Sequence, residues 1–139
     1  MQIISRTHRA ASVAMIFLGF CYLVLYPKQV LFNQYGWIWD TPGRNFAMEH
    51  MLIAVYGCMG LFLMYGARDP VRFLPFIDFV IVSGILHATA MLIDALRIPG
   101  EEEHLMLRGD VIGMYWGPLL LMIFHPRKLY LGGLFGRAA

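Results

Sequence analysis

Four long apolar segments, separated by short polar stretches, dominate the pattern of the chain. They cover about residues 9–26, 42–66, 70–96 and 110–125. About 20 residues of helix are needed to cross the hydrocarbon of a bilayer, and fewer suffice where the helix ends are interfacial. The pattern therefore predicts an all-α fold, an integral membrane antiparallel four-helix bundle that forms a single transmembrane domain over residues 1–139.

Residues that favour helix ends mark the boundaries of these segments. In the motif ARDP, Asp69 is suited to cap the third helix, and Pro70 is suited to its first position, where the missing N–H costs nothing. Asp110, which follows the helix breaker Gly109, is the expected cap of the fourth helix. Pro118 lies inside the fourth segment and is expected to kink it.

The composition also indicates a membrane protein. Hydrophobic residues make up 59% of the chain and charged residues 14%, whereas roughly a quarter of the residues in a soluble domain are charged. So few charges cannot cover the surface of a soluble globule, and the lipid bilayer is the first partner that the sequence predicts. A net charge of +2 without a dense basic run argues against nucleic acid as a partner.

The distribution of positive charges predicts the orientation. The first apolar segment lacks a small-x-small cleavage site, so we expect it to remain as a membrane helix. Four crossings place both termini on one side, with seven of the eleven Lys and Arg residues: Arg6, Arg9, Arg68, Arg72, Arg127, Lys128 and Arg137. By the positive-inside rule that side is cytoplasmic.

The connection between the first two segments is rich in aromatic residues. Its sequence, VLFNQYGWIWD, contains Tyr35, Trp37 and Trp39, whose rings settle at the boundary between headgroups and hydrocarbon. We therefore expect this loop to lie folded on the membrane surface.

Ionisable residues gather toward the opposite, outer ends of the helices. The first candidates for a ligand or metal site are Glu49, His87, Asp94, His104 and Asp110, and the second are His50, Tyr56 and Glu101. His87 and Asp94 are seven residues apart and share one helix face. Because an Asp in the bilayer centre costs about 2.5–3.5 kcal/mol on insertion scales, we expect this face to point into the bundle, toward Glu49 and the fourth helix.

Several kinds of chemistry could use such a polar pocket. Imidazole and carboxylate suit a transition metal, and Glu101 with His104 has the i, i+3 spacing of di-iron bundles, although this motif occurs once. His87 alone could be the axial ligand of a pigment, with Ser83 one turn away leaving room for a ring. The sequence contains no nucleophile elbow and no phosphate-binding loop.

Each candidate also has a simpler structural interpretation. Asp110 can be a helix cap, the three glutamates a solvated turn, and His87 the donor of an interhelical hydrogen bond. Asp94 can pair with Arg97 or Arg108. The residues alone leave these alternatives open.

Small residues on two of the helices predict close helix packing. Gly57 and Gly60 lie in the second segment, and Gly113 and Gly117 in the fourth. Small residues let helix backbones approach within a membrane, either inside the bundle or against a neighbouring subunit.

Several motifs, taken in order, resemble a family of small bacterial four-helix membrane proteins of unknown function. They are GWIW, the start of the second helix with Glu49, ARDP, His87 in the third helix, and HLMLRGD, and they cover roughly Tyr26 to Pro126. The matching polar positions are Glu49, Arg68, Asp69, His87, His104 and Asp110. The resemblance implies the four-helix membrane fold and this set of polar positions but no reaction.

Two functions fit these patterns. The first is a non-catalytic accessory or stabilising subunit of a larger membrane complex, which could hold a lipid, pigment or metal in its outer pocket. Its partners would be other membrane subunits or further copies of the chain. The second is a small membrane enzyme or metal-binding protein that uses a site of histidine and carboxylate residues.

Overall fold

A computed structural model describes residues 6–28, 46–97 and 110–127. In these ranges the chain forms helices and no strand. The elements are α1 (Arg6–Phe20), a π-helical segment that continues it (Cys21–Leu25), α3 (Phe46–Gly66), α4 (Leu74–Arg97) and α5 (Asp110–Ile123). The predicted all-α class is confirmed for the described chain, whereas Tyr35, Trp37 and Trp39 lie outside it.

Two of the helical stretches are long and apolar enough to cross a membrane, judged by length and composition. These are His8–Lys28 and Leu74–Arg97. The apolar parts of the other two helices, His50–Gly66 and Val111–Ile123, are shorter.

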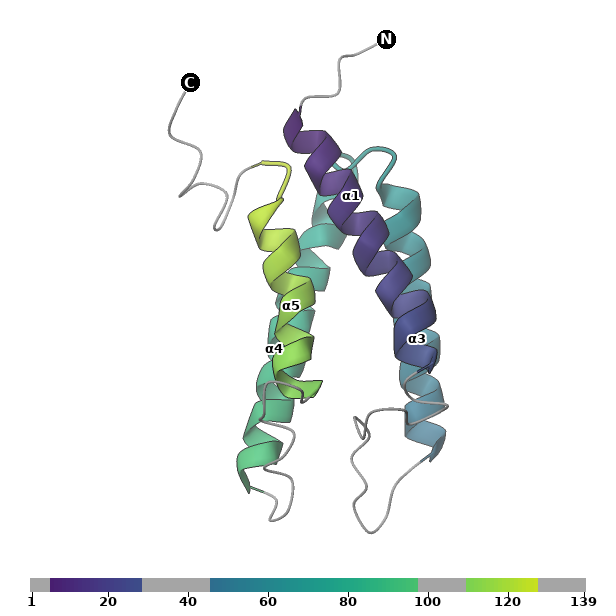
Figure 1. Cartoon of the computed structure of the whole chain (residues 1–139), viewed down its shortest axis with the longest axis vertical. Helices are drawn as coiled ribbons and strands as arrows, with labels where there is room; N and C mark the ends of the chain where they lie inside the picture. Colours follow the sequence, from purple (N-terminus) through teal and green to yellow (C-terminus); the bar gives the residue numbers. More distant parts are fainter. Residues whose placement is uncertain (1–5, 29–45, 98–109, 128–139) are drawn as a thin grey trace.

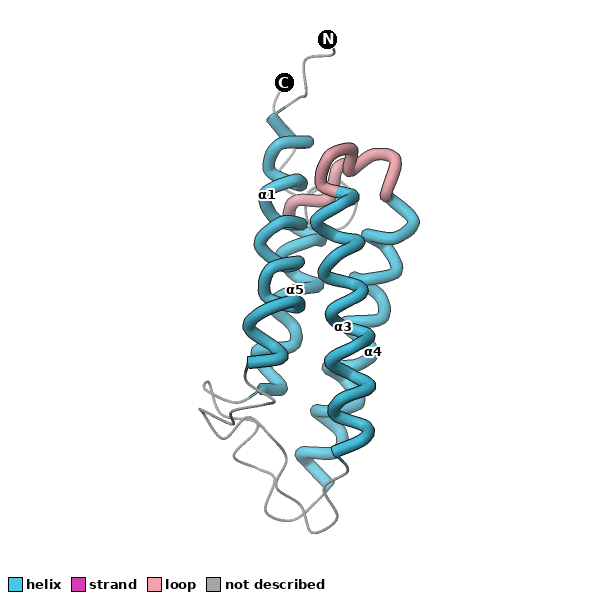
Figure 2. Tube along the Cα trace, turned by 90° about the vertical axis from the view of Figure 1, so that its right-hand side faces the viewer, coloured by secondary structure: helices cyan, strands magenta, loops and turns pink. Residues whose placement is uncertain are grey.

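Successive helices run antiparallel and form two pairs (Figure 1). α1 packs along α3, α4 packs along α5, and α1 also contacts α5. The two pairs converge where residues 67–73 connect α3 to α4, here called the turn end, and diverge toward the opposite end (Figure 1). Seen from the side, α1 and α5 lie at one edge and α3 and α4 at the other (Figure 2).

The hydrophobic core lies in the half of the molecule nearest the turn end. All four helices contribute to it, with Met15, Leu18, Leu63, Ile77, Val80, Ile81 and Leu121 among its buried residues. These positions come early in α1 and α4 and late in α3 and α5, as antiparallel neighbours require. Aliphatic packing therefore joins the helices in the half nearest the turn end. Aromatic and polar contacts join them in the other half.

The closest approach of α1 to α3 occurs at two glycines. A Cβ atom at Gly60 would lie 2.7 Å from the carbonyl oxygen of Gly19 and 3.2 Å from the backbone nitrogen of Leu23. A Cβ atom at Gly19 would lie 2.8 Å from the carbonyl oxygen of Gly60. The two backbones touch here, and any side chain would force them apart.

A proline and a glycine join α4 to α5 in a similar way. The ring of Pro118 lies over Gly84, where a Cβ atom would be 2.5 Å from the ring Cγ. Pro118 lies inside α5, as the sequence predicts, and its buried ring fills the space that Gly84 leaves. The proline thus contributes packing to the helix pair.

The start of α4 differs from the sequence prediction. The Oδ1 of Asp69 accepts a hydrogen bond from the backbone N–H of Arg72 at 3.3 Å, but this bond closes a turn that precedes the helix. Residues 70–73 form turns, and the α-helix begins at Leu74. Pro75 accounts for this shift, because a proline offers no N–H for a bond to the preceding turn and fits only the first turn of a helix.

The far end of the chain shows the same effect of proline. α5 ends at Ile123, two residues before the predicted boundary at 125. His125 precedes Pro126, and a residue before proline disfavours the helical conformation.

The four glycines predicted to pack helices fall into two groups. Gly60 contacts α1, and Gly117 lies against α1 with a hypothetical Cβ 2.9 Å from Leu18 Cδ1. Gly57 has only Leu23 within reach, at 4.0 Å, and nothing lies within 4 Å of Gly113. Gly57 and Gly113 therefore do not bring helices together within the described chain.

The two glycines of α3 provide a matched test of this packing. Gly60→Ala should lower the free energy of unfolding by about 1–3 kcal/mol, because the new methyl group overpacks the contact with α1. Gly57→Ala should leave stability unchanged or raise it by up to about 1 kcal/mol through helix propensity. Thermal unfolding of the purified variants, followed by circular dichroism, measures both. Equal effects at the two positions would contradict the proposed contact.

Candidate functional site

Three tyrosines meet between α1 and α3, beyond the aliphatic core. The ring centroids of Tyr22 and Tyr56 are 5.1 Å apart, and those of Tyr26 and Tyr56 are 4.6 Å apart. Tyr22 and Tyr56 are buried and Tyr26 is half-buried. Tilted aromatic pairs at such distances contribute roughly 0.5–1.5 kcal/mol beyond the area they bury. Tyr56 is the centre of this cluster.

His87 of α4 completes the cluster from the other helix pair. Its ring lies 5.9 Å from that of Tyr56 with an interplanar angle of 81°, an edge-to-face contact. The histidine is half-buried. The structure thus brings together two of the residues selected from the sequence, His87 and Tyr56, although α3 and α4 are not among the closely packed helix pairs. We call Tyr22, Tyr26, Tyr56 and His87 the tyrosine–histidine cluster.

The fourth helix also borders this cluster. A Cβ atom at Gly117 would lie 3.2 Å from the hydroxyl oxygen of Tyr22, so a side chain there would crowd that hydroxyl group. Tyr22 therefore contacts α3 through its ring and α5 through its hydroxyl end. Side chains and backbone from all four helices meet at this level.

The π-helical segment of the first helix lies within the cluster. It contains Tyr22, and the backbone N–H of Tyr26 donates to the carbonyl oxygen of Cys21, the i to i−5 bond that defines a π turn. Such single π turns are rare and frequently mark functional sites. Here the segment lies directly against Gly60, so the irregular turn occurs where the backbones of α1 and α3 are closest.

The cluster offers phenol hydroxyl groups and an imidazole in largely apolar surroundings. Phenols donate and accept hydrogen bonds, and a neutral imidazole does both through its two nitrogens. The imidazole is also a ligand for transition metals and pigments. The cluster could thus bind one polar or aromatic group or join the helix pairs.

A hydroxyl pair links α4 to α5 near the cluster. Thr89 Oγ1 donates to the carbonyl oxygen of Ile85 at 2.7 Å and lies 3.1 Å from the hydroxyl oxygen of Tyr115. Since the single proton of the threonine is used in the first bond, Tyr115 donates in the second. This bond ties the middle of α4 to the first half of α5.

A second polar link joins the same helices at the turn end. His125 Nε2 lies 3.1 Å from Asp78 Oδ1, with the histidine side chain 0% exposed and the Asp78 side chain 40% exposed. The backbone N–H of Arg127 donates to His125 Nδ1 at 3.4 Å, so in the neutral ring the proton is on Nε2 and points at the carboxylate. Asp78 therefore accepts a charge-assisted hydrogen bond from a fully buried donor.

The structure describes Asp94 as exposed and does not decide whether it faces the predicted pocket, so its site role stays a prediction. Its side chain is exposed, while the next residue, Ala95, is fully buried. The buried face of α4 includes Ala88 and Ala95, each one residue and so about 100° around the helix from His87 and Asp94. His87 is half-buried because the ring of Tyr56 lies against it. Asp94 lies seven residues closer to the end of α4, and toward that end the helix pairs diverge (Figure 1).

The remaining candidates lie in places that leave their side chains undescribed or exposed. Glu49 is in the first turn of α3 and Asp110 is the first residue of α5, and the structure does not describe either side chain. Glu101 and His104 lie outside the described residues, and His50 is exposed. Within residues 6–28, 46–97 and 110–127, no three His, Cys, Asp or Glu side chains form a group that could hold a metal.

Some contacts of the site were not predicted from the sequence. Tyr22 and Tyr26, four residues apart on one helix face, are a pattern that could have drawn attention to that face. Asp78 and His125 have a similar depth on neighbouring antiparallel helices, which could have suggested the pair. The contact partner of each of these residues could not be predicted, because it depends on which helices touch.

Comparison with known proteins adds one finding. A protein family, described as a family of unknown function (DUF6632), matches the chain over residues 6–126. No curated protein and no solved structure matches it.

Two aspartates on α4 allow the buried link to be tested. Asp78→Ala takes the acceptor away from His125 Nε2–H, which should lower the free energy of unfolding by about 1–2 kcal/mol, as expected for a partly exposed bond near a helix end. Asp94→Ala removes the same charge from an exposed position and should change stability by less than about 0.5 kcal/mol. Thermal or denaturant unfolding compares the two, and similar losses would mean that the Asp78–His125 bond does not stabilise the fold.

Proposed function

Because the chain belongs to DUF6632, a family of unknown function, we propose its function from its own residues. It is a small multi-pass protein of the bacterial inner membrane with both termini in the cytoplasm. It acts without catalysis, as an accessory or stabilising subunit of a larger membrane complex.

The observation that carries this proposal is the apolar outer surface of the helices. Large hydrophobic side chains are exposed on each of them, such as Phe17 at 59%, Met51 at 69%, Leu86 at 66% and Trp116 at 68%. Soluble monomers rarely expose contiguous apolar surface on this scale. Acyl chains and the helices of neighbouring subunits are the surroundings in which such side chains are stable.

The lengths of the helices support a membrane location. The stretches His8–Lys28 and Leu74–Arg97 have 21 and 24 residues. At 1.5 Å per residue they are about 32 and 36 Å long, enough for the roughly 30 Å of bilayer hydrocarbon.

The exposed positive charges support cytoplasmic termini. Arg9, Arg68, Arg72 and Arg127 are all exposed and belong to the turn end, where α1 and α4 begin and α3 and α5 finish. The exposed cations at the opposite end of the described chain are Lys28 and Arg97. The positive-inside rule assigns the richer end to the cytoplasm.

The polar contacts favour a structural role over a catalytic one. The Asp78–His125 bond and the Thr89–Tyr115 bond each join α4 to α5, and the Tyr56–His87 contact joins α3 to α4. These groups connect helices, which is what a stabilising subunit requires of them.

Fractionation and co-purification test the proposal. The protein with an affinity tag should remain in the membrane pellet after alkaline carbonate washing, because its apolar surface requires lipid. From mild detergent it should then purify with the same membrane proteins in fixed proportions, as measured by quantitative mass spectrometry.

A control variant separates specific partners from detergent aggregates. Trp116→Ala shortens the most exposed aromatic side chain of α5. Because this side chain is not part of the buried core, the variant should stay folded and lose only the partners that contact α5. Recovery of the protein in the soluble fraction would contradict the membrane location. A membrane-bound protein that purifies alone would contradict the accessory role.

A second function, a small membrane enzyme or a metal- or pigment-binding protein, is favoured by one observation. His87 lies at the level of the π-helical segment beside Tyr56, and π turns often accompany functional sites. Any further ligands would come from the undescribed side chains of Glu49, Asp110 or His104.

Elemental analysis and an absorbance spectrum of the purified protein decide between the two functions. The second requires a metal or pigment in fixed proportion to the chain, with loss of most of it in His87→Ala. The exposed His50 provides the control, because His50→Ala should not change the content. A protein with no metal and no chromophore, and with fixed partners, supports the accessory role.

A further inference from the structure

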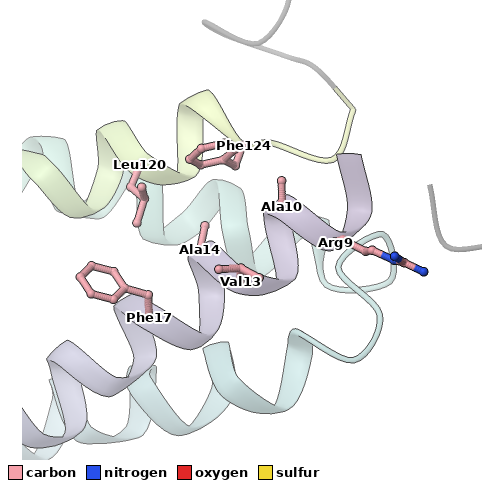
Figure 3. Close-up of a pocket in the computed structure, with 7 residues that line it drawn as sticks. All are labelled: Arg9, Ala10, Val13, Ala14, Phe17, Leu120 and Phe124. Carbon is pink, nitrogen blue, oxygen red and sulfur yellow. The ribbon is translucent and has the colours of Figure 1, made fainter. Parts of the chain in front are cut away.

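An apolar groove separates α1 from α5 near the turn end. It has a volume of about 350 Å³ and is lined by Arg9, Ala10, Val13, Ala14, Phe17, Leu120 and Phe124. Figure 3 shows Leu120 and Phe124 across from the side chains of α1, with the small Ala10 and Ala14 between the larger residues. Six of the seven lining residues are apolar, and the seventh is a cation at one end.

The position of Arg9 gives the groove a polar end. Arg9 is exposed, and its guanidinium group points away from the apolar lining, along α1 toward the end of the helix (Figure 3). A long basic side chain of this kind covers apolar surface with its stem and carries its charge to the headgroup region. The apolar part extends from Arg9 to Phe17, roughly 12 Å by helical rise.

We propose that this groove binds one anionic phospholipid, with an acyl chain between α1 and α5 and its phosphate at Arg9. A guanidinium group is suited to phosphate because its planar N–H donors make two parallel bonds to the phosphate oxygens. The proposal rests on the membrane location proposed above and identifies a ligand there.

The charges at this end of the molecule favour a lipid over a second copy of the chain. Copies that share a membrane have the same orientation, so a second copy at the groove would bring its own arginine-rich end toward Arg9. Arg68, Arg72 and Arg127 are exposed at that end as well, and the resulting repulsion disfavours the contact. An anionic headgroup at Arg9 brings no such repulsion.

A second groove of similar size shows what the first one adds. It lies between α3 and α4, also measures about 350 Å³, and is lined by Ala54, Val55, Cys58, Met59, Phe62 and Phe76. None of these residues is charged, so this groove cannot distinguish lipid headgroups. It therefore provides the control for the first.

Native mass spectrometry of the full chain in detergent tests the proposal, with phosphatidylglycerol and phosphatidylcholine of identical acyl chains as probes. One phosphatidylglycerol should bind about five- to tenfold more tightly than phosphatidylcholine, because the choline ammonium of phosphatidylcholine offsets the charge of its phosphate and phosphatidylglycerol has no such group. Glycerophosphoglycerol, which has the same headgroup and charge as phosphatidylglycerol but no acyl chain, should not bind.

Two variants of the groove and two controls locate the site. Arg9→Gln should lower the affinity for phosphatidylglycerol to that for phosphatidylcholine, and Ala10→Phe should weaken both lipids by filling the groove. The controls are Arg72→Gln, which removes an exposed arginine at the same end, and Ala54→Phe, which enlarges a residue in the second groove. Neither control should change the affinity for either lipid. The surface variant Arg9→Gln keeps the test valid if Ala10→Phe fails to fold.

Several results would overturn the proposal. They are equal binding of the two lipids by the unchanged protein, unchanged binding in Arg9→Gln, and a lipid-free dimer that Ala10→Phe converts to a monomer. If the protein stays in the carbonate-washed membrane and one of these results is found, only the lipid site is refuted. A protein absent from the membrane refutes the proposed function itself.

Discussion

The close approach of α1 to α3 at Gly19 and Gly60 is the constraint on which the other contacts depend. With backbone atoms in contact at this point, side chains on either side of it are brought face to face. Tyr22 follows Gly19 by three residues and Tyr56 precedes Gly60 by four, so the two rings meet directly beyond the glycines. The π-helical segment, which continues α1, lies at the same place, against α3. A larger residue at Gly60 would separate the tyrosines and leave His87 without its ring contact.

The α4–α5 pair is ordered by a series of contacts in place of one glycine pair. Asp78 with His125, Gly84 with Pro118, and Thr89 with Tyr115 occur in succession along both helices, as antiparallel register requires. Each contact is of a different kind: a charge-assisted hydrogen bond, a ring against a backbone, and a hydroxyl pair. Together they fix the register of α5, whose short apolar stretch would otherwise leave it poorly determined.

The sequence predicted the class of the fold and the position of most helices because both follow from local properties of the chain. Apolar length predicts helices that are able to span a membrane, and the turn at Asp69 depends on a hydrogen bond three residues away. The exposure of Asp94 could not be predicted, because it depends on how far apart the helix pairs lie, which no local pattern specifies. Tyr22 and Pro118 acquired their roles in the same way, from glycines on other helices that leave space for them. His87 of α4 does reach Tyr56 of α3, but the side chain of Glu49 is not described, so the pocket expected to gather Glu49, His87 and Asp94 stays a prediction.

The question of why an apolar chain contains buried polar groups has a structural answer here. In the membrane location proposed above, lipid tails are as apolar as leucine, so removing aliphatic side chains from lipid gives helices little reason to associate. Close packing at small residues and hydrogen bonds between helices then provide the association, each bond contributing roughly 0.6 kcal/mol on average. His125, Asp78, Thr89 and Tyr115 are placed where such bonds join α4 to α5, and His87 is placed where a ring contact joins the two pairs. The ionisable residues Asp78, His87 and His125 are therefore evidence for helix contacts first, and for chemistry only where a bound ligand is found.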